Sequence, residues 1–397
     1  MSLALASTPL YDCPAPGAAS PFRICFRAHV GPLPTTLLEV VLAVAIVVGL
    51  LAGWGRLPWR NPYTWPALVV LAGASLGVVV APDHRAALGL WKAYFVEPML
   101  AGVIIAWLAA ERRNARMLLA GLAVAGTLVA VLNLIAFGIV VSEHVDVVRQ
   151  PAVVLYRSPN DITLFLVPLQ AVALAIALFG DEARERRLAI PFLAITFLAD
   201  VASLSRGGWL AMVVVVLVVG LFSTRRLLIA AGAAVVVAAA LAIPGSRRRI
   251  LVQFDPNSAD NSVQLRFVLW RSALNMLRHN PIFGGGLSGF QQAVRPYSDP
   301  NYHEQLIDPH NLVLNWWSET GLLGLAGFVW TAVQVGRTAW AGLRAGPWPR
   351  AVSIGLLGVL AGIVAHGLVD VPYFKNDLAV EFWALLGLQL GALRGAR

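Results

Sequence analysis

The sequence predicts an all-α polytopic membrane protein, with about 11 or 12 transmembrane helices and one long extracytoplasmic loop that contains an amphipathic helix. The first observation behind this prediction is composition. Of 397 residues, 58% are hydrophobic and 13% are charged, whereas soluble globular proteins have roughly 45–50% apolar and about 25% charged residues. A soluble fold could not bury so much apolar surface. The other two observations are a series of apolar segments and an uneven distribution of arginines between the loops.

The apolar segments are long enough to cross a bilayer. A helix needs about 20 apolar residues to span about 30 Å of hydrocarbon, where lipid offers no partners to backbone N–H and C=O groups. The boundary between the sixth and seventh segments, at Ser205 to Gly207, is the least distinct. The predicted spans are approximately 36–53, 65–81, 92–110, 117–141, 161–180, 188–204, 207–222, 227–243, 311–336, 351–369 and 377–393.

The basic residues predict the orientation of these spans. Cytoplasmic loops of membrane proteins carry an excess of Lys and Arg. Loops after odd-numbered spans, together with the C-terminus, hold 15 of the 30 basic residues. The C-terminus is therefore expected in the cytoplasm of a multi-pass plasma (inner) membrane protein. The net charge of +9 is attributed to this orientation and to membrane lipids as partners, not to nucleic acid.

The chain is predicted to form a single membrane domain over 1–397, because no repeat or low-complexity linker divides it. Residues 1–35 form a Pro-rich N-terminal segment that resembles neither a signal peptide nor a first span. Cys13 and Cys25 lie in that segment and could either form a disulfide or remain free thiols. Residues 244–310 are a long extracytoplasmic loop, and loops of this length are usually functional or disordered.

The long loop also contains the signature of an amphipathic helix. Apolar residues recur in it at spacings of four and three residues, a helix cap is available at Asn261 or Ser262, and Pro281 would end the helix. Such a helix would lie on the membrane surface or on the helical bundle. The apolar stripe consists of Val263, Phe267, Trp270, Leu274 and Leu277.

Two arginines at the outer side are candidates for binding an anion. Arg206, in Ser-Arg-Gly-Gly-Trp at 205–209, sits where a guanidinium next to hydrocarbon is costly unless it is paired or hydrated. Its structural alternative is an interfacial arginine paired with Asp200. Arg266 lies on the amphipathic helix, and its alternative role is a contact to solvent or to lipid headgroups.

His310 is the candidate base, where the long loop meets the ninth span. An unperturbed imidazole pKa near 6.5 leaves a neutral ring available at physiological pH. Its alternative role is at the start of a helix next to Asn311. Glu319, roughly 13 Å deeper by helical rise, and Asp370 at the outer end of the tenth span could orient the histidine, or could pair with an arginine for structure.

Signatures of soluble enzymes are absent from the sequence. It contains no GxxxxGK[ST] phosphate loop, no GxSxG elbow, and no HExxH or CxxC metal pair. No cofactor and no metal is therefore expected. The polar residues that the predicted topology brings to one face of the membrane are the remaining candidates for a site.

The candidate residues stand in several motifs around the long loop. The motifs are Ser-Arg-Gly-Gly-Trp at 205–209, Arg266 with Trp270, Asn-Pro-Ile-Phe-Gly-Gly-Gly-Leu at 280–287, and the stretch from Pro309 to Leu325 that begins Pro-His-Asn-Leu. Together they resemble the O-antigen ligase family, which includes Wzy-type polymerases. Two shorter motifs also fit the resemblance: Ser-Pro-Asn-Asp at 158–161, which contains Asn160, and His-Gly-Leu-Val-Asp-Val-Pro at 366–372. The sequence departs from the family in having eleven countable spans instead of about twelve.

The resemblance implies an inverting, metal-independent glycosyl transfer from an undecaprenyl-pyrophosphate glycan. Arg206 and Arg266 would hold the pyrophosphate and His310 would be the base, with Asn160 and Asn311 in support. The acceptor could be a glycan, a lipid or a protein. Two alternatives remain: a membrane transporter similar to bicarbonate carriers, and a non-catalytic partner of a polysaccharide export system. Carriers usually have polar residues or broken helices at the bilayer midplane, whereas the polar cluster here lies at the outer rim.

Overall fold

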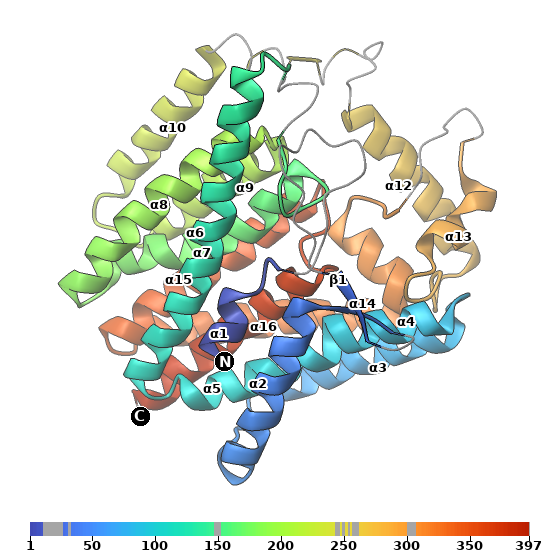
Figure 1. Cartoon of the computed structure of the whole chain (residues 1–397), viewed down its shortest axis with the longest axis horizontal. Helices are drawn as coiled ribbons and strands as arrows, with labels where there is room; N and C mark the ends of the chain where they lie inside the picture. The colour runs from blue at the N-terminus through green and yellow to red at the C-terminus, as the bar shows by residue number, and fades with distance from the viewer. Residues whose placement is uncertain are drawn as a thin grey trace.

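The computed structural model describes residues 1–10, 27–30, 33–146, 152–242, 262–299 and 307–396, together with the isolated positions 247, 251, 252 and 255. These residues are mostly helical (Figure 1). The one sheet among them is an antiparallel pair, β1 (Arg27–Val30) and β2 (Leu33–Thr36). Cys13 and Cys25, for which a disulfide was considered, lie outside the described residues.

Many of the helices are joined by short connections. The bounds of the helices are α1 Ser2–Ala6, α2 Leu37–Gly53, α3 Thr64–Val80, α4 His84–Trp91, α5 Glu97–Leu108, α6 Arg112–Ser142, α7 Pro159–Phe179, α8 Ala183–Ser203, α9 Arg206–Gly220, α10 Arg226–Ala242, α12 Ser262–His279, α13 Phe290–Val294, α14 Leu312–Gly342, α15 Pro347–Gly367 and α16 Asn376–Gly395. Longer segments separate α6 from α7, α10 from α12 and α13 from α14. A π-helical turn at Lys92–Val96 joins α4 to α5.

Each of the eleven predicted apolar segments falls on one of these helices. Six helices in the described part of the chain are long and apolar enough to cross a membrane, which makes the protein a multi-pass membrane protein. They are Leu37–Arg56, His84–Leu108, Arg112–Ser142, Pro159–Phe179, Pro347–Gly367 and Asn376–Gly395. Thr64–Val80, Arg206–Gly220 and Arg226–Val235 are apolar but shorter. The total of eleven spans therefore stays a prediction.

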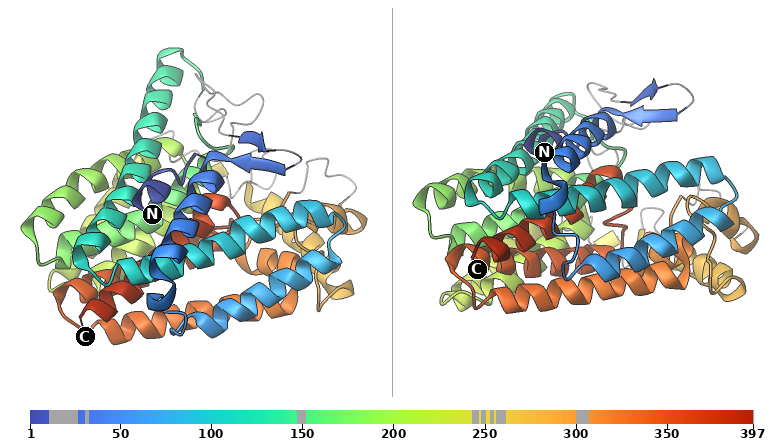
Figure 2. Two further views of the ribbon diagram at one scale, coloured as in Figure 1. Left: turned by 60° about the horizontal axis from the view of Figure 1, so that its bottom comes forward. Right: turned by 90° about the horizontal axis from the view of Figure 1, so that it is seen from below.

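The relative directions of the packed helices place the ends of several helices at the same end of the bundle. Gly73 lies against Gly324 and Val70 against Gly327, so α3 runs antiparallel to α14. α15 packs antiparallel to both α7 and α9, and α16 runs parallel to α5. As a result, the first turns of α7, α9, α14 and α16 share one end of the bundle with the last turn of α15. α12 and α13 cover that end (Figures 1 and 2).

α12 buries a different face from the one that its apolar stripe suggested. Its buried residues are Leu269, Ser272, Ala273, Met276 and Leu277, which pack against α13 and α14. Of the predicted stripe, only Leu277 is buried, whereas Val263, Phe267 and Leu274 are exposed. Both faces have helical periodicity, and the one with the smaller side chains packs against the bundle.

Candidate functional site

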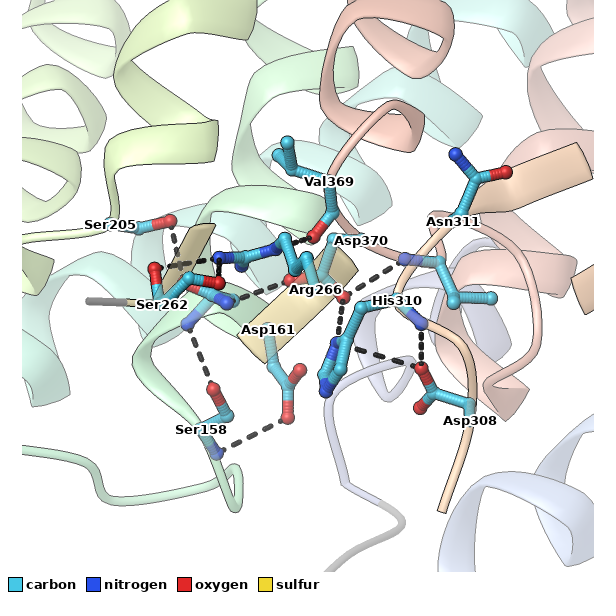
Figure 3. A network of polar contacts seen from close by, with 12 residues as sticks. Ser158, Asp161, Ser205, Ser262, Arg266, Asp308, His310, Asn311, Val369 and Asp370 are labelled. Atoms are coloured by element: carbon cyan, nitrogen blue, oxygen red, sulfur yellow. Dashed lines mark hydrogen bonds and ion pairs between the residues drawn. The ribbon is translucent and has the colours of Figure 1, made fainter. Parts of the chain in front are cut away.

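The polar residues predicted from the sequence, except Glu319, lie close together at the end of the bundle that α12 covers (Figure 3). They come from segments far apart in the chain. Asn160 begins α7, Arg206 begins α9, Arg266 is on α12, His310 precedes α14, and Asp370 follows α15. The fold brings these five segments together at one end of the bundle.

The turn before α14 fixes the position of His310. The backbone N–H of His310 donates to Asp308 Oδ1 at 2.8 Å. Asn311 is the N-cap of α14 and accepts from the N–H groups of Val313 and Leu314, each at 3.1 Å. His310 itself has φ of 45°, a left-handed conformation that is unusual outside glycine and is found preferentially at functional sites. The two polar neighbours thus hold the histidine in a strained turn.

Asp370 lies beside the imidazole. His310 Nδ1 is 3.6 Å from Asp370 Oδ1 and 3.5 Å from Asp308 Oδ1, within ion-pair distance but longer than a normal hydrogen bond. Burial lowers the pKa of His310, but Asp370 and Asp308 outweigh burial and raise the pKa above its ordinary value. Burial alone would raise the pKa of Asp370, yet His310 and other nearby cations hold it below its usual range. Asp370 is therefore an ionised carboxylate directed at one nitrogen of the ring.

Asn160 holds the other oxygen of Asp370. Its Nδ2 donates to Asp370 Oδ2 at 2.7 Å, and its Oδ1 accepts from the Ser205 hydroxyl at 2.8 Å. Ser205 is also the N-cap of α9, where its hydroxyl oxygen accepts from Gly208 N at 3.2 Å. The start of α7, the start of α9 and the acid beside the histidine therefore form one hydrogen-bonded chain.

The two arginines converge on Ser262. Arg266 Nη1 donates to Ser262 Oγ at 2.7 Å, and Arg206 Nη2 donates to the same oxygen at 2.8 Å. Arg266 Nε also donates to the carbonyl of Val369 at 2.7 Å. Burial lowers the pKa of Arg266, and the negative charges of Asp370 and Asp308 oppose this effect, so the guanidinium stays protonated. The two guanidinium groups are therefore close neighbours, because both donate to the same oxygen atom.

The glycines after Arg206 permit this approach. A Cβ at Gly208 would lie 2.4 Å from the Thr163 side chain, and a Cβ at Gly207 would lie 2.8 Å from the ring of His366. Larger residues would push α9 away from α7 and α15. The Ser-Arg-Gly-Gly sequence therefore combines a helix cap, a cation and two points of close helix contact.

Glu319 does not contact His310, although the sequence suggested that it could orient the histidine. Its Oε2 accepts from the backbone N–H of Ser288 at 2.5 Å, so it binds the loop between α12 and α13. α14 is interrupted at Gly321, which has φ of 66°. The loop fills this break, because Leu322 N donates to Ile282 O at 2.9 Å and Gly285 N donates to Ser318 O at 2.7 Å. Of the two acids considered, only Asp370 lies beside the histidine.

Several residues of the site were not identified from the sequence. Asp308 and Ser205 stand next to the motif residues around His310 and Arg206, so their positions in the sequence could have identified them. Ser262 was considered only as a helix cap. Lys375, which pairs with the buried Asp161 of α7, carries no motif. Among the described residues, no group of three or more His, Cys, Asp or Glu side chains is arranged to hold a metal ion.

One comparison with known proteins found a match that overlaps the region of the candidate site. Residues 191–329 match the family model described as O-antigen ligase. The matched region contains Arg206, Arg266 and His310, whereas Asn160 and Asp370 flank it. No curated protein matches the chain. The match confirms the resemblance that the motifs predicted: residues 191–329 of this multi-pass membrane protein are similar to the O-antigen ligase family of polysaccharide biosynthesis.

Proposed function

We propose that the protein transfers glycan from an undecaprenyl-pyrophosphate donor to an acceptor hydroxyl at the outer face of the plasma membrane. The family match supports membrane glycosyl transfer of the ligase or polymerase type. The match also favours an enzyme over a bicarbonate-type carrier or a non-catalytic export partner. The acceptor hydroxyl belongs to a glycan, a lipid or a protein.

The observation that carries this proposal is the pair of arginines beside an acid-supported histidine. Arg206 and Arg266 share the hydroxyl of Ser262, so their guanidiniums are close enough to bind neighbouring phosphates of one pyrophosphate. Guanidinium forms strong, often bidentate hydrogen bonds to phosphate oxygens. Arg266 is bound to neutral oxygen atoms of Ser262 and Val369, which leaves its positive charge to attract an anion.

His310 would act on the acceptor. With Nδ1 facing Asp370 and Asp308, the ring can keep a proton on Nδ1 and present Nε2 as the base. Nε2 would remove the proton of the acceptor hydroxyl as its oxygen attacks the anomeric carbon. The bond from that carbon to the pyrophosphate oxygen breaks in the same step, and the leaving pyrophosphate takes the electron pair. A single displacement inverts the configuration at the anomeric carbon.

The arginines would stabilise the transition state in the same step. Negative charge grows on the bridging oxygen as the pyrophosphate leaves, and preorganised cations aimed at such charge are usually a large part of catalysis. Two guanidiniums would supply this stabilisation without a divalent metal. The partly buried setting of Arg266 strengthens its interaction with an anion relative to water.

The test uses purified protein in detergent with a lipid-pyrophosphate glycan donor. Transfer should continue in EDTA, and Arg266→Lys and Arg206→Lys should each lose most of it, because an ammonium cannot reproduce the bidentate guanidinium. Arg271→Lys, an exposed position on the same helix, is the matched control and should keep wild-type activity. A strict requirement for added divalent metal, or full activity in both arginine variants at the site, would contradict the proposal.

A further inference from the structure

A cavity of about 900 Å³ lies between α6, α7 and α8, at the end of the bundle opposite the candidate site. Its walls are apolar along most of their length, with Leu122 from α6, Leu169 from α7 and Ile195 from α8 among the lining residues. Charged residues line only one end, where α6 and α8 begin. These are Arg116, Glu182, Arg184 and Glu185.

The depth of the cavity matches one leaflet of a bilayer. On α6 the lining extends from Arg116 to Thr127, a separation of about 16 Å at the helical rise of 1.5 Å per residue. Half of the hydrocarbon thickness of a bilayer is about 15 Å. Beyond this depth the helices close on each other, since Asn133 Nδ2 donates to the carbonyl of Ala199 at 3.3 Å.

The charged end of the cavity keeps a net positive charge after its ion pairs are counted. Glu182 and Glu185 are ion-paired with Arg112 and Arg116. Arg184 is exposed and has no hydrogen bond or ion pair with any residue that the structure describes. The segments 111–116 and 181–187 together hold six arginines against four acidic residues. An anion at this end of the cavity would therefore be attracted.

We propose that this cavity binds one anionic phospholipid from the leaflet at that end of the bundle. Its acyl chains would occupy the apolar part between α6, α7 and α8, and its phosphate would contact Arg184. A water-soluble metabolite would leave the apolar walls unsatisfied, whereas an acyl chain buries them. A zwitterionic lipid would bring its own cation to a surface that is already positive. This site is independent of the proposed glycosyl transfer.

The experiment measures lipid retained by the full-length, detergent-purified protein in native mass spectrometry. The probes are phosphatidylglycerol and phosphatidylcholine with identical acyl chains. The wild type should retain one phosphatidylglycerol about fivefold more strongly than phosphatidylcholine, as expected when one arginine contacts an anionic lipid. Arg184→Gln should abolish this preference. Arg187→Gln, on the same exposed turn but outside the cavity lining, should keep it.

A second pair of variants tests the apolar part. Ala123→Phe places a large side chain at a lining position and should reduce retention of the first lipid of either kind by about tenfold, because the ring takes the space of an acyl chain. Ala52→Phe, at an exposed position of α2, is the control. Equal retention by both phenylalanine variants would overturn the site. Equal retention of the two lipids by the wild type would overturn the proposed preference of the cavity for an anionic lipid. Arg184→Gln tests that preference even if Ala123→Phe does not fold.

Discussion

Arginines at the two ends of the helical bundle are held in different ways. Arg266, at the candidate site, donates to the hydroxyl of Ser262 and to the carbonyl of Val369. Arg112, at the opposite end, donates to the carboxylates of Asp181 and Glu185, and its guanidinium lies 4.8 Å from the centre of the Trp348 ring. Carboxylates neutralise a guanidinium, whereas neutral oxygens orient it and leave its charge in place.

The acids at the two ends differ correspondingly. Asp370 is directed at His310 and is held by Asn160, so its charge supports a histidine. Asp181, Glu182 and Glu185 are paired with arginines, so their charges join helices. The same residue types therefore form the proposed catalytic arrangement at one end and an ion-paired, structural arrangement at the other. Substitutions at the two ends test this distinction.

Replacing His310 with alanine should have the largest effect. Turnover should fall by roughly 10² to 10⁴, the usual contribution of a general base, while donor binding stays nearly unchanged because both arginines remain. Donor binding and single-turnover transfer by the purified variant are the measurements. His84→Ala, at an exposed histidine on α4, is the control. A folded His310→Ala protein with wild-type turnover would remove the histidine from the mechanism.

Asp370→Asn should change the pH dependence as well as the rate. Transfer by the wild type should rise with pH through an apparent pKa above 6.5, because the base must be neutral and Asp370 raises its pKa. Without this acid, burial dominates, and the rising limb should move to lower pH. The maximal rate should fall about 10-fold to 100-fold as the ring loses its orientation.

Asn160→Ala provides the matched comparison for the pH profile. It removes the 2.7 Å hydrogen bond to Asp370 but keeps the charge beside His310. Its rate should fall while its rising limb stays near that of the wild type. If both variants shift the limb equally, the charge of Asp370 does not control the protonation of His310.

Glu319→Ala should have an intermediate effect. The N–H of Ser288 would lose its carboxylate acceptor, which costs about 1–3 kcal/mol for a buried group. The loop would then hold α12 less firmly, so the KM for the donor should rise while the pH profile stays unchanged. Glu143→Ala, at an exposed position, is the control. Thermal unfolding and transfer kinetics measured together would show whether Glu319 acts through the loop; an altered pH profile would instead connect it to His310.

Arg112→Gln should have the smallest effect. Its ion pairs are partly exposed, and such pairs contribute roughly 0.2–1 kcal/mol each. We expect a lower unfolding temperature, together with wild-type transfer per folded molecule. Loss of transfer by the folded variant would show that arginines at this end also serve the reaction.

Many of the helices were predictable from the sequence, because lipid offers no hydrogen-bond partners to the backbone. Eleven apolar segments fall on helices, since every N–H and C=O in hydrocarbon needs a partner within its own segment. The number of spans is harder to predict, because helices such as α8 and α14 are long but also carry polar residues, and they are not among the six helices that are long and apolar enough to cross a membrane.

The site residues were predictable as a set, but their contacts were not. Motif position brought attention to Arg206, Arg266 and His310, which do lie together. The placement of Glu319 depends on a loop that folds back into a broken helix, and helical rise alone gives no indication of this. The bond from Arg266 to the Val369 carbonyl joins residues far apart in sequence through the backbone, which side-chain patterns do not reveal.

The break at Gly321 divides α14 into two parts. The part before the break follows His310 and is joined to the loop after α12 by Glu319 and Ser318. The part after the break is joined to the same loop by Leu322, and α3 packs along both parts. α12 carries Arg266, so this loop connects the helix of a proposed phosphate ligand to the helix that follows the proposed base. Hydrogen bonds on both sides of the break would keep these two groups at a constant separation while a long glycan chain is bound.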